Sequence, residues 1–100
     1  MPKLVREKVP EFYKKEGYRV ETKQVAGDEL YDALLKKLQE EVNEFLAGKD
    51  AEELPDILEV LHNIASFHTI TPQQLEEKRN KRAEEKGLYT AGVILEKTSF

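Results

Sequence analysis

Residues 36–60, KKLQEEVNEFLAGKDAEELPDILEV, contain two apolar-periodic segments separated by a short break at Gly48-Lys49-Asp50. Apolar side chains recur every three or four residues on both sides of the break, which predicts two amphipathic helices. A loop this short makes the two helices antiparallel neighbours. The stretch therefore predicts a helical hairpin, and we expect an all-α fold built around it.

Acidic residues follow helical spacing on both predicted helices. Glu41 and Glu44 lie three apart on the first helix, and Glu53 and Asp56 lie three apart on the second. Residues three apart share one face of a helix, so the two acid pairs can face one another across the hairpin. On a helical wheel, Glu41 and Glu53 fall inside the apolar arcs, and the other two acids fall at the edges. We therefore expect two acids to point inward and two to border the core.

Buried carboxylates are costly unless they are paired or coordinate a metal. Mg²⁺ is a hard cation that takes carboxylates together with waters and substrate phosphates. The pattern therefore supports a Mg²⁺ site formed by Glu41, Glu44, Glu53 and Asp56. The competing interpretation is an exposed, solvated acidic face. For Glu53 alone, a capping box with Asp50 as the N-cap is a further alternative.

The composition is typical of one soluble, helix-rich domain spanning residues 1–100, with 39% hydrophobic and 36% charged residues. The absence of cysteine excludes disulfides and thiolate metal sites. No apolar run approaches the roughly 20 residues of a membrane span, and the N-terminus lacks a signal-peptide core. We expect a cytoplasmic protein with no membrane partner. The net charge of −4 argues against binding to a nucleic acid polymer.

Capping and helix-breaking residues predict where the helices begin and end. Asp28 is the expected N-cap of the first long helix, and Pro55 moves the start of the second helix toward Glu53. Thr71 followed by Pro72 and Gln74 has the pattern of a capping box and starts a third long helix. The predicted helices cover residues 10–16, 29–47, 53–68 and 72–86.

Residues 18–25 partly alternate between apolar and polar side chains, which predicts a short strand or an extended segment. Residues 92–96 are the only obvious partner, so a minor β ribbon is included in the predicted fold. Strong apolar arcs occur only on the two helices of the hairpin. A four-helix core therefore needs further helices, and we expect an antiparallel helix bundle completed by homodimerisation.

Basic residues gather in residues 3–15 and 78–86, on either side of the acidic middle of the chain. This arrangement suits a polyphosphate that a metal contacts on one side and ammonium or guanidinium groups on the other. A solvated helix with Glu–Lys pairs is the alternative for residues 78–86. Asn63 shares a helix face with Asp56, where it either hydrogen-bonds a base or ribose or forms a polar flank of the core.

Three segments carry a family resemblance. Glu40-Glu41-x-x-Glu44 followed by Glu53-x-x-Asp56 resembles the paired ExxE and ExxD motifs of the all-α nucleotide pyrophosphohydrolases, the superfamily of MazG and phosphoribosyl-ATP pyrophosphohydrolase. The segment KLVREKVP, residues 3–10, resembles the KLVRDKIP opening of small MazG-like proteins. The segment KRAEEKGLY, residues 81–89, resembles their closing KRxERGGF segment. The chain departs from the pattern in its short spacer between the acid motifs, in Pro55, and in Leu88 where a second glycine is usual.

The resemblance implies a Mg²⁺-dependent nucleoside triphosphate pyrophosphohydrolase. Such a hydrolase cleaves the anhydride between the α- and β-phosphates and releases a nucleoside monophosphate and pyrophosphate. The resemblance implies these site residues: Glu41, Glu44, Glu53 and Asp56 as metal ligands, Glu40 as a carboxylate beside the ligands or a general base, and Lys81, Arg82, Arg6 and Lys8 as substrate contacts. Two alternatives stay open, namely phosphoribosyl-ATP hydrolysis and a non-catalytic helical binding module on the same fold.

Overall fold

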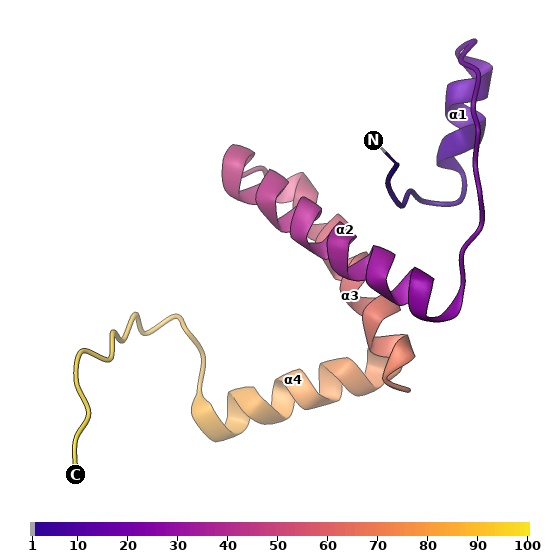
Figure 1. Ribbon diagram of the computed structural model, residues 1–100. Helices are drawn as coiled ribbons and strands as arrows, with labels where there is room; N and C mark the ends of the chain where they lie inside the picture. The colour runs from indigo at the N-terminus through magenta and orange to yellow at the C-terminus, as the bar shows by residue number, and fades with distance from the viewer. Residues whose placement is uncertain (1) are drawn as a thin grey trace.

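The computed structural model describes residues 2–100, and its secondary structure is entirely helical. The elements are α1 (Val9–Lys15), α2 (Gly27–Gly48), the 3₁₀ turn η1 (Ala51–Glu53), α3 (Leu54–Phe67) and α4 (Pro72–Lys86). Figure 1 shows α2 and α3 packed side by side at the centre, with α1 on one side and α4 extending away on the other. The predicted all-α class and the predicted hairpin are therefore confirmed. None of the described helices is long and apolar enough to cross a membrane.

The turn between α2 and α3 is short because both helix ends are capped locally. Lys49 adopts a left-handed conformation with φ 53°, and its backbone N–H donates to the carbonyl oxygen of Phe45 at 2.6 Å. The Asp50 carboxylate then accepts from the backbone N–H of Glu52 at 3.0 Å and starts η1. The cap therefore involves Glu52, and the capping box that was the alternative role for Glu53 does not form.

Two of the helix starts agree with the prediction from the sequence, and one differs from it. α3 begins at Leu54 with Pro55 in its first turn, where the missing N–H of proline removes no helical hydrogen bond. The Thr71 capping box is confirmed, because Thr71 Oγ1 accepts from Gln74 N at 3.1 Å and Gln74 Oε1 accepts from Thr71 N at 2.9 Å. Asp28 is not an N-cap. It lies inside the first turn of α2, where its negative charge interacts favourably with the helix dipole.

The predicted β ribbon is wrong for the described part of the chain, because residues 18–25 and 92–96 contain no strand. Figure 1 places the first segment between α1 and α2 and the second beyond α4, on opposite sides of the central helix pair. Backbones separated in this way cannot exchange hydrogen bonds. Alternation within one segment predicts which side chains share a face, but it does not bring a partner strand into reach.

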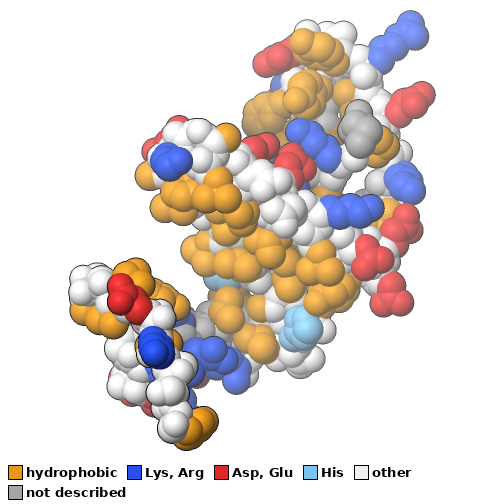
Figure 2. Space-filling model, turned by 60° about the vertical axis from the view of Figure 1, so that its left-hand side comes forward, with side chains coloured by type: hydrophobic (Ala, Val, Ile, Leu, Met, Phe, Trp, Pro, Cys, Tyr) orange, Lys and Arg blue, Asp and Glu red, His pale blue; other side chains and the backbone are white. Residues whose placement is uncertain are grey.

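The hydrophobic core of the single chain is small. The buried hydrophobic residues are Leu34, Val60 and Ala65. The radius of gyration is 18.0 Å, whereas about 13 Å is typical of a compact domain of this length. Large apolar side chains on the central pair remain exposed, namely Leu35, Leu46, Leu54, Leu58, Leu61 and Phe67. Figure 2 shows hydrophobic side chains running across the middle of the molecule.

Candidate metal and phosphate site

Three carboxylates converge where the second half of α2 faces the start of α3. One carboxylate oxygen each from Glu41, Glu53 and Asp56 lies within 4.8 Å of the others. The antiparallel packing of α2 and α3 brings Glu41 opposite the other two acids, which share a face because they are three residues apart. The predicted meeting of acids from two helices is therefore confirmed for these three residues.

Glu41 is the buried member of this acid cluster, with 7% of the residue exposed. Its Oε1 lies 3.1 Å from Lys37 Nζ, and its Oε2 is buried without a hydrogen-bond partner. An unsatisfied buried carboxylate oxygen costs free energy that a ligating cation would recover. The inward orientation predicted for Glu41 is confirmed, and the free oxygen suits an oxygen-seeking cation.

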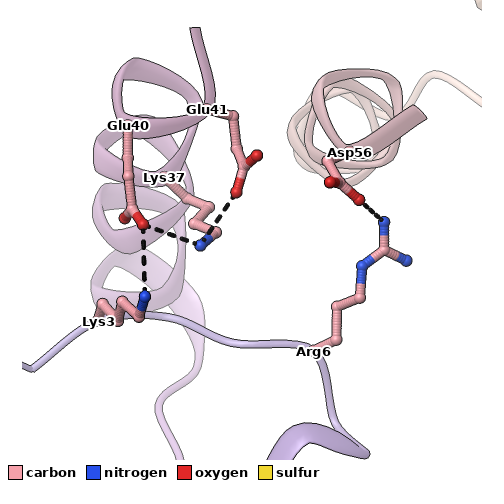
Figure 3. Close-up of polar contacts among 6 residues, drawn as sticks. All are labelled: Lys3, Arg6, Lys37, Glu40, Glu41 and Asp56. Carbon is pink, nitrogen blue, oxygen red and sulfur yellow. Dashed lines mark hydrogen bonds and ion pairs between the residues drawn. The ribbon is translucent and has the colours of Figure 1, made fainter. Parts of the chain in front are cut away.

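Basic side chains from two separate segments surround the acid cluster. Arg6 Nη2 donates to Asp56 Oδ1 at 2.8 Å, although the two residues are 50 positions apart in the sequence. Lys3 Nζ lies 3.8 Å from Glu40 Oε1, and Lys37 Nζ donates to the same oxygen at 3.3 Å. Figure 3 shows Arg6 reaching Asp56 on α3 and Lys37 lying between Glu40 and Glu41 on the side of α2 that faces α3. The site therefore combines metal-ligand chemistry with cations that suit phosphate.

The electrostatics of the cluster shift two pKa values. The half-buried position of Glu53 raises the pKa of its carboxyl, and the negative charges of Glu44, Glu41, Asp56 and Asp50 raise it further. Burial lowers the pKa of Lys37, but its hydrogen bonds with Glu41 and Glu40 outweigh this effect and leave the pKa above its ordinary value. The carboxyl of Glu53 therefore holds its proton more tightly than an ordinary glutamate does, while Lys37 is held in its charged form.

Glu44 and Glu40 lie beside the cluster rather than in it. Glu44 is exposed and is not one of the three acids whose oxygens converge, although its charge still raises the pKa of Glu53. Glu40 is half-buried and pairs with Lys37 and Lys3. The roles of Glu44 as a metal ligand and of Glu40 as a general base stay predictions.

The predicted substrate contacts are spread over the molecule. Arg6 reaches the acids, and Asn63 lies two helical turns beyond Asp56, where its amide donates to Glu59. Lys8 is the N-terminal neighbour of α1 and is exposed. Lys81 and Arg82 are on α4, which among the described helices contacts α3 only. Figure 1 shows α4 extending away from the end of α3 that is remote from the acids, so the single chain does not bring the two residues to the cluster.

The sequence did not single out Lys3, whereas it allowed Lys37 to pair with Glu41, with an ordinary helix-surface pair as the alternative. Lys3 appeared only as one charge of a basic run. The pair of Lys37 with Glu41 does form, and its two side chains are only 17% and 9% exposed, so it is not an ordinary surface pair. The available signal was the position of Lys37 one turn before Glu41, which itself lies in an apolar arc. A lysine paired with an inward-pointing acid is expected to be partly buried as well.

Comparisons of this chain with protein-family models, with curated proteins and with solved structures find no match. The resemblance to the all-α nucleotide pyrophosphohydrolases therefore stays a prediction from the quoted motifs.

Proposed function

We propose that this protein is a Mg²⁺-dependent nucleoside triphosphate pyrophosphohydrolase. The observation that carries the proposal is the convergence of Glu41, Glu53 and Asp56, with one buried carboxylate oxygen left unpartnered. Hard donors of this kind fit Mg²⁺, which binds through carboxylates and substrate phosphates. The neighbouring cations Arg6 and Lys37 suit the negative charge of a polyphosphate.

The proposed reaction is hydrolysis of the anhydride between the α- and β-phosphates. Water forms a bond to phosphorus, the anhydride P–O bond breaks, and the products are a nucleoside monophosphate, pyrophosphate and a proton. Mg²⁺ held by the acid cluster would neutralise phosphate charge and lower the pKa of bound water. Arg6 would exchange Asp56 for a phosphate oxygen, and Lys37 would hold the Glu41 side chain in place through their ion pair. Glu40 is our candidate for the base that accepts the proton.

The oligomeric state belongs to the same proposal. Leu54, Leu58 and Leu61 form an exposed stripe at helical spacing on α3, while Leu35 and Leu46 are exposed on α2. Burying these side chains against a second helical hairpin gives a four-helix bundle, which supplies the core that the single chain lacks. We therefore propose a homodimer. In it, α4 of the partner is the source of the Lys81 and Arg82 side chains predicted to contact phosphate.

The test compares neighbouring acids that differ in their position relative to the cluster. Glu53→Gln removes a carboxylate of the cluster, whereas Glu52→Gln removes an exposed carboxylate from the same 3₁₀ turn. We expect Glu53→Gln to abolish Mg²⁺-dependent release of pyrophosphate from nucleoside triphosphates and Glu52→Gln to retain it, with both variants folded by circular dichroism. Full turnover by Glu53→Gln contradicts the assignment. Phosphoribosyl-ATP belongs in the substrate panel, because the acid cluster does not distinguish the two substrates.

One observation favours a non-catalytic binding module. Arg6 and Lys37 already pair with two of the converging acids, so the cluster is partly neutralised without a metal. A Mg²⁺ site stabilises the folded state by about 2.7 kcal/mol when the metal is at 100 times its Kd. A melting temperature that does not respond to Mg²⁺, together with no turnover on any nucleotide, supports the binding module instead.

A further inference from the structure

A groove of about 590 Å³ runs from the acid cluster along the α2–α3 pair. The N-terminal segment, residues 3–7 together with Val9, forms one wall, and successive turns of α2 and α3 form the floor. Glu41 and Asp56 lie at one end, and Leu30 and Asn63 lie further along the same lining. The volume lies within the range of about 300–1,000 Å³ that is usual for small-molecule sites.

The character of the groove changes along its length. Asp56, Glu59 and Asn63 line it at three- and four-residue intervals, so they follow one face of α3. Seven residues of helix separate Asp56 from Asn63, a rise of about 10.5 Å. Between these ends, Leu34 and Val60 supply a buried apolar floor. Charge at one end, apolar surface in the middle and a polar pair at the far end match the sequence of phosphate, sugar and base in a nucleotide.

The polar pair at the far end presents acceptors. Asn63 Nδ2 donates to both the carbonyl oxygen and Oε2 of Glu59, each at 2.8 Å. These two bonds use both amide hydrogens of Asn63, which leaves its Oδ1 as an acceptor. The second carboxylate oxygen of Glu59 is also an acceptor. The pair therefore offers hydrogen-bond acceptors to any group that enters the groove.

We propose that the groove is a nucleoside subsite, in which Glu59 and Asn63 accept hydrogen bonds from a base that carries an exocyclic amino group. This inference rests on the proposed function, because the phosphates of the same nucleotide lie at the acid cluster. Guanine presents its N1–H and amino group as adjacent donors and fits a carboxylate best. Adenine and cytosine present one amino group each. Uracil and thymine have no amino group, and their single N3–H donor lies between two carbonyl oxygens that would face the acceptors of the protein. A site built to accept from an amino group discriminates against a base that lacks that group.

The experiment measures binding of non-hydrolysable α,β-methylene triphosphates in Mg²⁺ by calorimetry, with inorganic tripolyphosphate as the ligand that has no base. We expect the guanosine analogue to bind at least 10-fold more tightly than the uridine analogue and than tripolyphosphate. Glu59→Gln replaces one acceptor oxygen by a donor and should reduce the guanosine–uridine difference to under 3-fold. Asn63→Trp fills the far end of the groove and should remove the advantage of nucleotides over tripolyphosphate.

The matched control is Glu84→Gln, since Asn80 Nδ2 donates to Glu84 Oε1 at 3.3 Å in a similar i,i+4 pair on α4, outside the groove. It should bind every ligand as the wild type does. The subsite is overturned if the wild type binds all bases with equal affinity, or if base discrimination survives in both groove variants. In either case, Mg²⁺-dependent binding of tripolyphosphate leaves the proposed function standing. Failure of every triphosphate and of tripolyphosphate to bind in Mg²⁺ overturns both.

Discussion

The ion pair between Lys37 and Glu41 gives the sharpest test of how the acid cluster is held. The pair joins Lys37 Nζ and Glu41 Oε1 at 3.1 Å, and the two side chains are only 17% and 9% exposed. Removing one partner of a buried pair leaves an uncompensated charge and typically costs 3–5 kcal/mol. We therefore expect Lys37→Met to lower the free energy of unfolding by about 3 kcal/mol in EDTA, near the lower limit because Lys37 is partly exposed. Since 1 kcal/mol shifts the melting temperature of a domain this size by about 4–8 °C, the drop should exceed roughly 10 °C.

A double-mutant cycle separates the lost interaction from lost packing. Lys37→Met/Glu41→Leu replaces both charges by apolar groups of similar size, and such replacements of buried pairs are often neutral or stabilising. The double variant should therefore be more stable than Lys37→Met alone in EDTA, as measured by urea denaturation. It should also lose any stabilisation by Mg²⁺, because Glu41 is a proposed ligand. A cost below about 0.5 kcal/mol for Lys37→Met, or a double variant no more stable than the single one, would refute the buried-pair argument.

Three further predictions test other parts of the structure. The pKa of Glu53 lies above its ordinary value of 4.5, so its stabilising contribution is present below the unfolded pKa and is lost as the pH rises through the folded pKa. In EDTA, the stability of the wild type relative to Glu53→Gln should therefore fall as the pH rises from 4.5 toward neutrality, and a constant difference in urea denaturation contradicts this. Thr69 is a β-branched residue at φ 61°, a conformation that glycine adopts without strain. Thr69→Gly should therefore raise the free energy of unfolding by about 1 kcal/mol. The control Thr98→Gly should not raise it. Leu58 is 50% exposed on the stripe proposed to meet a second copy. Sedimentation equilibrium should therefore show that the wild type is a dimer and that Leu58→Asp weakens this dimer. A monomeric wild type counts against the proposed bundle.

The proposed dimer and the proposed site depend on each other in a testable way. α4 carries Lys81 and Arg82 away from the acids of its own chain, because it contacts α3 near the end remote from Asp56. Phosphate contact by these residues therefore requires the partner's α4. The cations that the single chain places at the acids, Arg6 and Lys37, need no such arrangement. Loss of activity on dilution below the dimer dissociation constant would distinguish the two sources of positive charge.

Local patterns in the sequence determined the helices and part of the site. The apolar period on each side of residues 48–50 predicted the α2–α3 hairpin, because burying one face of each helix requires that spacing. The capping box at Thr71 and the effect of Pro55 are interactions within a few residues, so they could be recognised before folding. The same wheel argument predicted that Glu41 points inward, because its angular position on the helix does not depend on distant contacts.

The tertiary structure decided which charges meet. A helical wheel gives the angle of each side chain but not the rotation of one helix against the other, and that rotation brings Glu53 and Asp56 to Glu41 while leaving Glu44 outside the cluster. The path of the N-terminal segment has no periodic signal, so only the fold shows Arg6 at Asp56 across 50 residues of sequence. The prediction of a β ribbon was wrong for the same physical reason. Alternation is a local property, whereas strand pairing depends on where the rest of the chain carries each segment.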